Sequence, residues 1–224
     1  MLAIATGGIT TNPDGSVIPN SFTKRREQAA AFWLVDTMRN GRPMPVIWLL
    51  DGNSSAENKF VERDYFKQAV WKFSDHTIEI PDSQFRIDGA FNTSESIAHF
   101  AAGFRDEEGK RAVLFTDDFH SKRLSMLACA NGIPSRTLTT EAILMEKYPD
   151  RKDAIRAWMN SKYVEYLNGR EARKRLTLLW FPNGEMLTTM KKAHTNDPNS
   201  VMLQVVDPKP DGDLIKITPD IPDP

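Results

Sequence analysis

The sequence predicts an α/β fold with a mostly parallel sheet, followed by a C-terminal helical and β addition. Over residues 1–140, short apolar runs alternate with helical patterns, which is typical of right-handed βαβ units. The run PVIWLL at residues 45–50 is apolar throughout, as expected of a strand that is buried on both faces. After residue 140 the pattern becomes helical and charged. These observations predict one α/β core and an extension.

The first strand is expected at Leu2–Ala5, and a helix follows over residues 22–39 with Thr23 as its N-cap. A helix beginning near Thr93 carries the pattern of a capping box. In this pattern Asn92 or Thr93 is the N-cap, and the Glu95 side chain hydrogen-bonds back to the amide of the cap residue. The other strands are expected at residues 45–50, 77–80, 112–115 and 136–138, and the other helices at residues 56–73, 93–104 and directly after the fourth strand.

The C-terminal third has its own expected order. Residues 141–175 are predicted to be helical, with a break at Pro149 and a C-cap at Asn168-Gly169. A hairpin (LTLLWF, PNG, EMLTTM) and a last strand (VMLQVV) are expected to follow. Three regions result: a ligand-binding core at 1–140, an extension at 141–206, and a flexible tail rich in proline and aspartate at 207–224.

Composition excludes several functional classes. The 224 residues are 40% apolar and 26% charged, which is ordinary for a globular protein. With 29 basic and 30 acidic residues, the net charge of -1 argues against nucleic acid or an anionic membrane as the partner. No apolar run approaches the roughly 18 residues of a membrane span, and the N-terminus does not read as a signal peptide. Cys129 is the only cysteine, which excludes a disulfide within the chain, and we expect a cytoplasmic protein.

Polar or glycine-rich residues follow each of the first four predicted strands. The strand ends read Thr6-Gly7-Gly8, Asp51-Gly52-Asn53, Pro81-Asp82-Ser83 and, after the fourth strand, Thr116 to His120. Open α/β sheets bind ligands outside the carboxyl ends of their strands. Four such ends in register therefore predict a ligand site at this edge of the sheet.

The residue types at these ends favour a small anionic ligand. Gly7 and Gly8 allow the backbone to approach a ligand closely and to offer amide N–H groups. Arg26 lies in the first helix, where it can reach an anionic group. His120 and Arg123 are three residues apart at the start of a helix, so they share a face and can flank one ligand. Because a histidine titrates near neutral pH, His120 is the candidate acid/base.

Several short motifs occur in a fixed order over residues 1–140. They are AIATGG, Arg26, LLDGNSSAENKFVERDYF, IPDS, NTSES and TDDFHSKR, followed by the turn NGIP. In this order they resemble the YdcF/SanA-like family, a domain named for its unknown function. The chain departs from the family pattern at Asp51-Gly52, where Ser-Gly-Gly is common, at Ser96, where Asn is usual, and at Leu124, where a small residue is usual.

The resemblance implies a Rossmann-like three-layer sandwich with a polar cleft at the carboxyl edge of the sheet. It also implies a nucleotide-like ligand, and S-adenosylmethionine has been proposed for YdcF-type proteins. We therefore expect a small anionic or nucleotide-like ligand, with S-adenosylmethionine as a candidate cofactor and no metal. The expected ligand-binding residues are Gly7, Gly8, Arg26, Asp51, Gly52, Asn53, Glu57, Asp82, Ser83, Asn92, Thr93, Glu95, Thr116, Asp117 and Arg123, with Glu62 as an alternative to Glu57.

Two other functional classes remain open from the sequence. In the first, the chain is a Mg²⁺-dependent phosphoester hydrolase whose oxygen ligands are Asp51, Asp82, Asp117 and Asp118. Against it, there is no DxD motif after the first strand, and adjacent aspartates diverge in extended backbone. In the second, the chain is a non-enzymatic adaptor or scaffold that uses residues 141–206 as its interaction surface.

Overall fold

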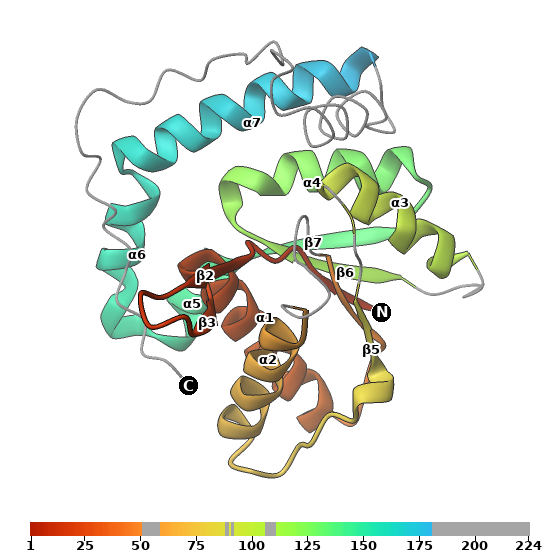
Figure 1. Ribbon diagram of the computed structural model, residues 1–224, viewed down its shortest axis with the longest axis vertical. Coiled ribbons are helices and arrows are strands. Elements are labelled where there is room, and N and C mark those ends of the chain that lie inside the picture. Colours follow the sequence, from red (N-terminus) through yellow and green to blue (C-terminus); the bar gives the residue numbers. More distant parts are fainter. Residues whose placement is uncertain (51–58, 88–89, 91, 106–110, 181–224) are drawn as a thin grey trace.

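The computed structural model describes residues 1–50, 59–87, 90, 92–105 and 111–180. Within these ranges a five-stranded parallel sheet lies between two layers of helices (Figure 1). The predicted α/β class, a Rossmann-like three-layer sandwich, is confirmed. No helix among the described residues is long and apolar enough to cross a membrane.

The order of the strands places a switch point in the middle of the sheet. The chain runs outward from β1 through β4 to β5, then returns to the other side of β1 with β6 and β7, which gives the order β5-β4-β1-β6-β7. The winding direction therefore reverses between β1 and β6, and in such sheets the crevice at this reversal is the usual ligand site. The bounds are Leu2–Ile4 for β1, Ile47–Leu49 for β4, Phe85–Ile87 for β5, Ala112–Thr116 for β6 and Ser135–Thr139 for β7.

Each face of the sheet has its own apolar core. Leu2 and Ile4 of β1 face the first core and Ala3 faces the second, because successive side chains of a strand point to opposite faces. The first core is completed by α1 (Ser21–Arg39), α2 (Lys59–Phe73), α5 (Thr140–Lys147) and α6 (Lys152–Met159). The second is completed by α3 (Thr93–Phe104), α4 (Asp118–Ala130) and α7 (Lys162–Trp180), with α7 packed on α4 (Figure 1).

A hairpin between β1 and α1 was not predicted. It pairs β2 (Ile9–Thr11) with β3 (Val17–Pro19), and Asp14 Oδ1 accepts hydrogen bonds from the amide and hydroxyl of Ser16 in its turn. The helix that follows begins earlier than expected, because Asn20 and not Thr23 is the N-cap. The Asn20 side chain accepts from the amides of Phe22 and Thr23.

The predicted strand at residues 77–80 is wrong. The strand at this place in the sheet is β5, which pairs in parallel with β4 through Phe85 opposite Ile47 and Ile87 opposite Leu49. A short 3₁₀ helix at Asp82–Gln84 leads into it. Asp82 and Ser83 therefore precede the strand and lie at its amino end, so the expectation that they belong to the carboxyl edge is also wrong.

The C-terminal extension packs directly on the core. The chain breaks at Pro149 as predicted, where a 3₁₀ helix at Pro149–Arg151 separates α5 from α6. Helix α7 then runs through Asn168-Gly169 to Trp180, so the predicted C-cap is wrong and the first part of the predicted hairpin is helical. The helix continues because Leu178 is buried in the second core. The rest of that hairpin, the last strand and the tail lie outside the described residues.

Candidate functional site

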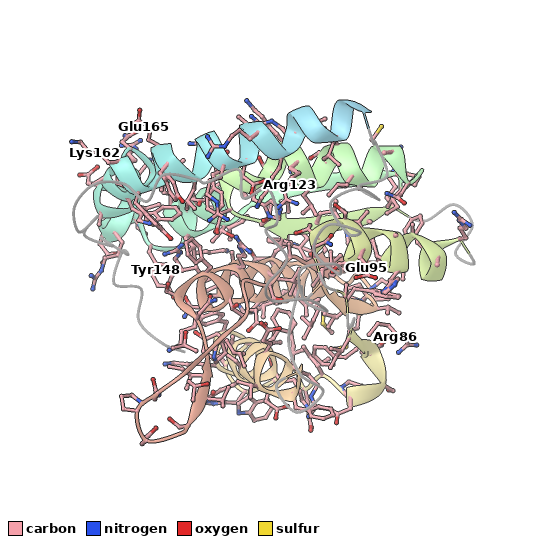
Figure 2. The ribbon with its side chains drawn as sticks, turned by 45° about the horizontal axis from the view of Figure 1, so that its top comes forward. Arg86, Glu95, Arg123, Tyr148, Lys162 and Glu165 are labelled. Carbon is pink, nitrogen blue, oxygen red and sulfur yellow. The ribbon has the colours of Figure 1, made fainter. Side chains whose placement is uncertain are left out.

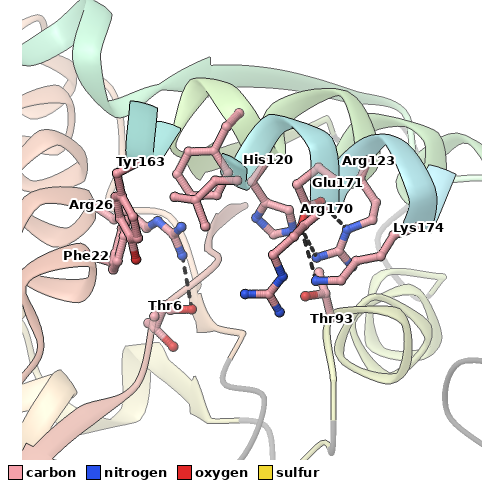
Figure 3. A pocket seen from close by; sticks show the side chains of 13 residues that line it. Thr6, Phe22, Arg26, Thr93, His120, Arg123, Tyr163, Arg170, Glu171 and Lys174 are labelled. Atoms are coloured by element: carbon pink, nitrogen blue, oxygen red, sulfur yellow. Dashed lines mark hydrogen bonds and ion pairs between the residues drawn. The ribbon is translucent and has the colours of Figure 1, made fainter. Parts of the chain in front are cut away.

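A cavity of about 310 Å³ lies at the carboxyl edge of the sheet, beside the switch point (Figure 3). It is bounded by the segments that follow β1 and β6, by the first turns of α1 and α3, and by one face of α7. The described residues that line it are Thr6, Gly7, Phe22, Arg26, Thr93, Phe119, His120, Arg123, Tyr163, Leu167, Arg170, Glu171 and Lys174. The predicted edge is therefore the one that carries the cavity.

The glycine pair shapes the turn after β1. A Cβ atom on Gly7 would lie 2.7 Å from Cβ of Phe22, so only glycine lets the end of β1 pass this close to α1. The amide of Gly7 donates to Thr23 Oγ1 at 2.9 Å, and the Thr23 hydroxyl donates to the carbonyl of Gly8 at 2.6 Å. The expectation that Gly7 offers its N–H to a ligand is therefore wrong, because Thr23 already accepts that proton. Gly8 does not line the cavity.

Arg26 is held rigidly between the two strands that flank the switch point. Its Nε and Nη2 donate to Asp117 Oδ2 at 2.9 and 2.6 Å, and its Nη1 donates to the carbonyls of Ala5 and Thr6 at 2.7 and 3.2 Å. Asp117 follows β6 and its side chain is fully buried. Arg26 thus lines the cavity as predicted, whereas Asp117 serves as its partner and does not face the ligand space.

Two more buried ionisable groups lie behind this pair. The guanidinium carbon of Arg25 lies 4.2 Å from the ring centroid of Trp158, and burial lowers the pKa of Arg25. Glu141 of α5 accepts a hydrogen bond from the amide of Asp118 at 2.9 Å. Burial and the nearby Asp117 raise the pKa of Glu141 to about 8. The protonated form of Glu141 is therefore favoured at neutral pH, and Asp117 is the carboxyl group that pairs with Arg26.

His120 lies in the first turn of α4 and faces the cavity (Figure 3). Its Nδ1 is 2.8 Å from Thr116 Oγ1, so the last residue of β6 orients the ring. Its Nε2 is buried and has no hydrogen-bond partner among the described residues. Burial, and then the charges of Arg123, Arg26 and Lys174, lower the pKa of His120 well below its ordinary value of 6.5. The imidazole is therefore neutral at physiological pH.

Arg123, one turn further along α4, pairs with α7. Its Nε and Nη2 donate to the two carboxylate oxygens of Glu171, and Lys174 Nζ lies 3.1 Å from Glu171 Oε1. Burial alone would raise the pKa of Glu171, but Arg123 and Lys174 outweigh burial and hold that pKa below its ordinary value. Figure 2 shows Arg123 inside the molecule, whereas Lys162 and Glu165 project outward from the first turn of α7.

The start of α3 contributes as the capping pattern predicted. Asn92 is the N-cap and accepts from the amides of Ser94 and Glu95 at 2.9 and 3.2 Å. Thr93, the first residue of the helix, lines the cavity. Asn92 and Glu95 do not line it, so among the described residues of this segment only Thr93 reaches the ligand space.

Of the remaining predicted site residues, some lie in the described part of the chain but away from the cavity, and the others lie outside the described residues. Asp82 is exposed and pairs with Arg63 at 3.0 Å and with Lys67 at 2.8 Å, away from the cavity, and Ser83 lies beside it. Glu62 is buried, its Oε1 lies 3.5 Å from Thr23 Oγ1, and it does not line the cavity. Asp51, Gly52, Asn53 and Glu57 lie outside the described residues.

Sequence reasoning missed the wall that α7 provides. This wall consists of Tyr163, Leu167, Arg170, Glu171 and Lys174. These positions recur every three or four residues, so they form one face of a single helix. The spacing was visible in the sequence, but nothing local indicated that this face would cover the edge of the sheet and not face solvent.

No cluster of three or more His, Cys, Asp or Glu side chains able to hold a metal ion occurs in the described part of the chain. No protein-family model, curated protein or solved structure matches the chain. Membership of the YdcF/SanA-like family therefore stays a prediction.

Proposed function

We propose that this protein binds a small molecule carrying a phosphate or similar anionic group in the cavity at the switch point. The observation that carries the proposal is the charge of its lining. Among the described residues, Arg26, Arg123, Arg170 and Lys174 face the cavity against a single carboxylate, Glu171. Even with Asp117 counted behind Arg26, and with Arg170 left out of the count, the cations among these described residues exceed the carboxylates by one. Such an excess in a partly enclosed space attracts anions.

His120 supports the same ligand class. A buried polar atom with no partner is costly, and the Nε2 of His120 is such an atom in the described structure. The ring lies in the first turn of α4, and the amino end of a helix favours negative charge. A ligand hydroxyl, such as the O–H of a phosphate monoanion, would satisfy the buried nitrogen by donating to it, and an anionic oxygen would accept from Nε2 once the ring is protonated.

We assign His120 the role of candidate acid/base in this proposal. The neutral ring is ready to accept a proton when Thr116 accepts the hydrogen on Nδ1, because Nε2, which has no hydrogen-bond partner among the described residues, then carries the free lone pair. A bound anion beside the ring favours the imidazolium and so raises the pKa of His120 toward neutrality. Ligand binding would then bring His120 into the range where it can transfer a proton.

The geometry favours this proposal over the other classes. The sulfonium of S-adenosylmethionine would add a positive charge to a lining that already has an excess of cations, so a phosphorylated ligand fits better. The Mg²⁺ hydrolase needs Asp82 and Asp117 together, but Asp82 lies at the amino end of β5 and Asp117 is paired with Arg26. The adaptor needs the extension as a free surface, but α7 packs on α4 and lines the cavity. A cytoplasmic location, supported by the single Cys129, belongs to the same proposal.

Calorimetric titration with inorganic phosphate tests the proposal. The matched variants Arg123→Met and Lys122→Met each remove one positive charge from α4, but only Arg123 lines the cavity. We expect Arg123→Met to weaken phosphate binding by about 1.5–3 kcal/mol, as for a hydrogen bond to a charged group, and Lys122→Met to leave it unchanged. Lys174→Met, which replaces a less buried cation, repeats the test if Arg123→Met does not fold. Absence of phosphate binding, or equal losses in the cavity and control variants, would overturn the proposal.

A further inference from the structure

The cavity has an apolar wall in addition to its cationic one. A third apolar cluster, separate from the cores on the two faces of the sheet, consists of Phe119, Trp158, Val164 and Leu167, with Phe22, Met159, Tyr163 and Tyr166 packed against it. Phe22, Phe119, Tyr163 and Leu167 of this cluster also line the cavity. Their apolar surface is therefore turned partly toward the ligand space.

Aromatic rings dominate this wall. The rings of Phe22 and Phe119 meet edge to face with their centroids 6.0 Å apart, and those of Phe22 and Tyr163 lie 6.4 Å apart. Phe22 and Tyr163 are only partly buried, so protein atoms do not cover them completely. Exposed ring surface inside a cavity favours a flat apolar group, because such a group buries that surface and stacks or meets it edge to face.

Two of the cations lie at the end of the cavity opposite the aromatic rings, whereas Arg26 lies 5.7 Å from the ring centroid of Phe22. Figure 3 shows Phe22 and Tyr163 together at one end, Arg123 and Lys174 at the other, and His120 between them. A bare phosphate at the cationic end would leave the aromatic end empty. The volume of about 310 Å³ falls at the lower end of the roughly 300–1,000 Å³ typical of small-molecule pockets. The space therefore suits a compact molecule with two unlike ends.

We propose that the ligand is a phosphomonoester that carries an aromatic ring, with the phosphate beside His120, Arg123 and Lys174 and the ring against Phe22 and Tyr163. This inference rests on the proposed anion-binding function and adds the class of the ligand's second group. It also assigns Tyr163 as a residue that selects the ligand, because its ring supplies aromatic surface from α7 without carrying charge.

Calorimetric titration of the full chain with phenyl phosphate, glycerol 3-phosphate and phenol tests the inference. The two esters share the phosphate and differ in the ring, so the ratio of their affinities isolates the aromatic wall. We expect phenyl phosphate to bind at least about tenfold more tightly than glycerol 3-phosphate, as a buried aromatic contact provides. In Tyr163→Ser we expect this ratio to fall toward one, with the binding of glycerol 3-phosphate little changed.

Tyr166→Ser is the matched control, because Tyr166 packs on the same cluster and does not line the cavity. It should keep the tenfold ratio. Tyr163→Leu, which keeps the cluster filled and removes only the flat ring, gives the same test if Tyr163→Ser does not fold. A ratio near one in the wild type, with both esters bound, would overturn this inference alone. If neither ester binds, or if phenol binds as tightly as phenyl phosphate, the anion-binding function fails as well.

Discussion

The two walls of the cavity hold their charges in different ways. The sheet wall comes from the predicted core and consists of Thr6, Gly7, Arg26 and His120, and the α7 wall consists of Tyr163, Leu167, Arg170, Glu171 and Lys174. In the sheet wall, Arg26 is bound by the fully buried Asp117 and by two backbone carbonyls. In the α7 wall, Glu171 is shared between Lys174 and Arg123 of α4, and all three line the cavity.

The two walls therefore differ in whether a bound ligand can displace the carboxylate that pairs with their cations. Asp117 is behind Arg26 and out of reach of a ligand, so the pair fixes the edge of the sheet whether or not the cavity is filled. Glu171 faces the same space as an incoming anion and occupies the donors of Arg123 and Lys174. A bound phosphate would therefore compete with Glu171, whereas it would leave Asp117 in place.

Breaking the buried pair of the sheet wall should have the largest effect. Asp117→Ala leaves Arg26 buried without its counter-charge, and breaking a buried pair in this way costs about 3–5 kcal/mol of unfolding free energy. Urea unfolding monitored by circular dichroism measures the loss. Asp82→Ala is the control, because Asp82 also pairs with two cations but is exposed, where solvent screens the pairs and they contribute little to stability. Equal losses in the two variants would show that the sheet wall is no more rigid than the surface.

The sheet wall was easier to predict than the α7 wall, because the sequence patterns that identify it lie within short segments of the chain. Apolar runs that end in polar residues identified the carboxyl edge, and the three-residue spacing of His120 and Arg123 placed both in the cavity. The strand β5 was missed because TIEI at 77–80 and FRI at 85–87 alternate equally well, and only pairing with β4 selects Phe85 and Ile87.

The α7 wall could not be predicted from the sequence, because the position of α7 depends on contacts between segments that are distant in the chain. Asn168-Gly169 reads as a helix end when only neighbours are considered. The helix continues because Leu167 and Leu178 are buried against other elements and Glu171 binds Arg123, which is 48 residues away in the chain. The helical spacing of residues 163–174 places aromatic and charged side chains on one face, but it does not indicate what that face covers.

Neutralising the internal anion of the α7 wall should strengthen ligand binding. Glu171→Gln removes the carboxylate that competes for Arg123 and Lys174 while keeping an amide oxygen that can accept from Arg123. We expect phosphate to bind about tenfold more tightly, or roughly 1.4 kcal/mol, with a loss of unfolding free energy of about 1 kcal/mol. Calorimetric titration and urea unfolding measure the two effects. Glu165→Gln removes the same charge from the outer side of α7 and should change neither (Figure 2). Weaker phosphate binding in Glu171→Gln would mean that Glu171 positions the cations and does not compete with the ligand.

His120 belongs to the sheet wall, and its titration should give the smallest effect on the free energy of unfolding. Because the pKa of His120 in the folded protein is well below 6.5, the unfolded chain takes up this proton first as the pH falls. The contribution of the neutral ring to stability is fully present above pH 6.5 and is lost progressively as the pH falls toward the folded pKa. The slope is at most about 1.4 kcal/mol per pH unit, and we expect a loss of about 1 kcal/mol between pH 7.5 and 5.5.

The variant His120→Asn isolates this contribution. Glu141, whose pKa is raised to about 8, acts in the opposite sense, because its stabilising proton is lost as the pH rises toward 8. Glu141 titrates in both proteins, so its effect cancels when the unfolding free energy of the variant is subtracted from that of the wild type at each pH. The unfolding free energy of the wild type minus that of the variant should be smaller at pH 5.5 than at pH 7.5. Saturating phosphate should reduce this change, because an anion beside the ring raises the folded pKa of His120. If the unfolding free energies of the wild type and the variant changed in parallel with pH in the absence of phosphate, the ring would titrate as it does in water. The walls of the cavity would then leave it open to solvent.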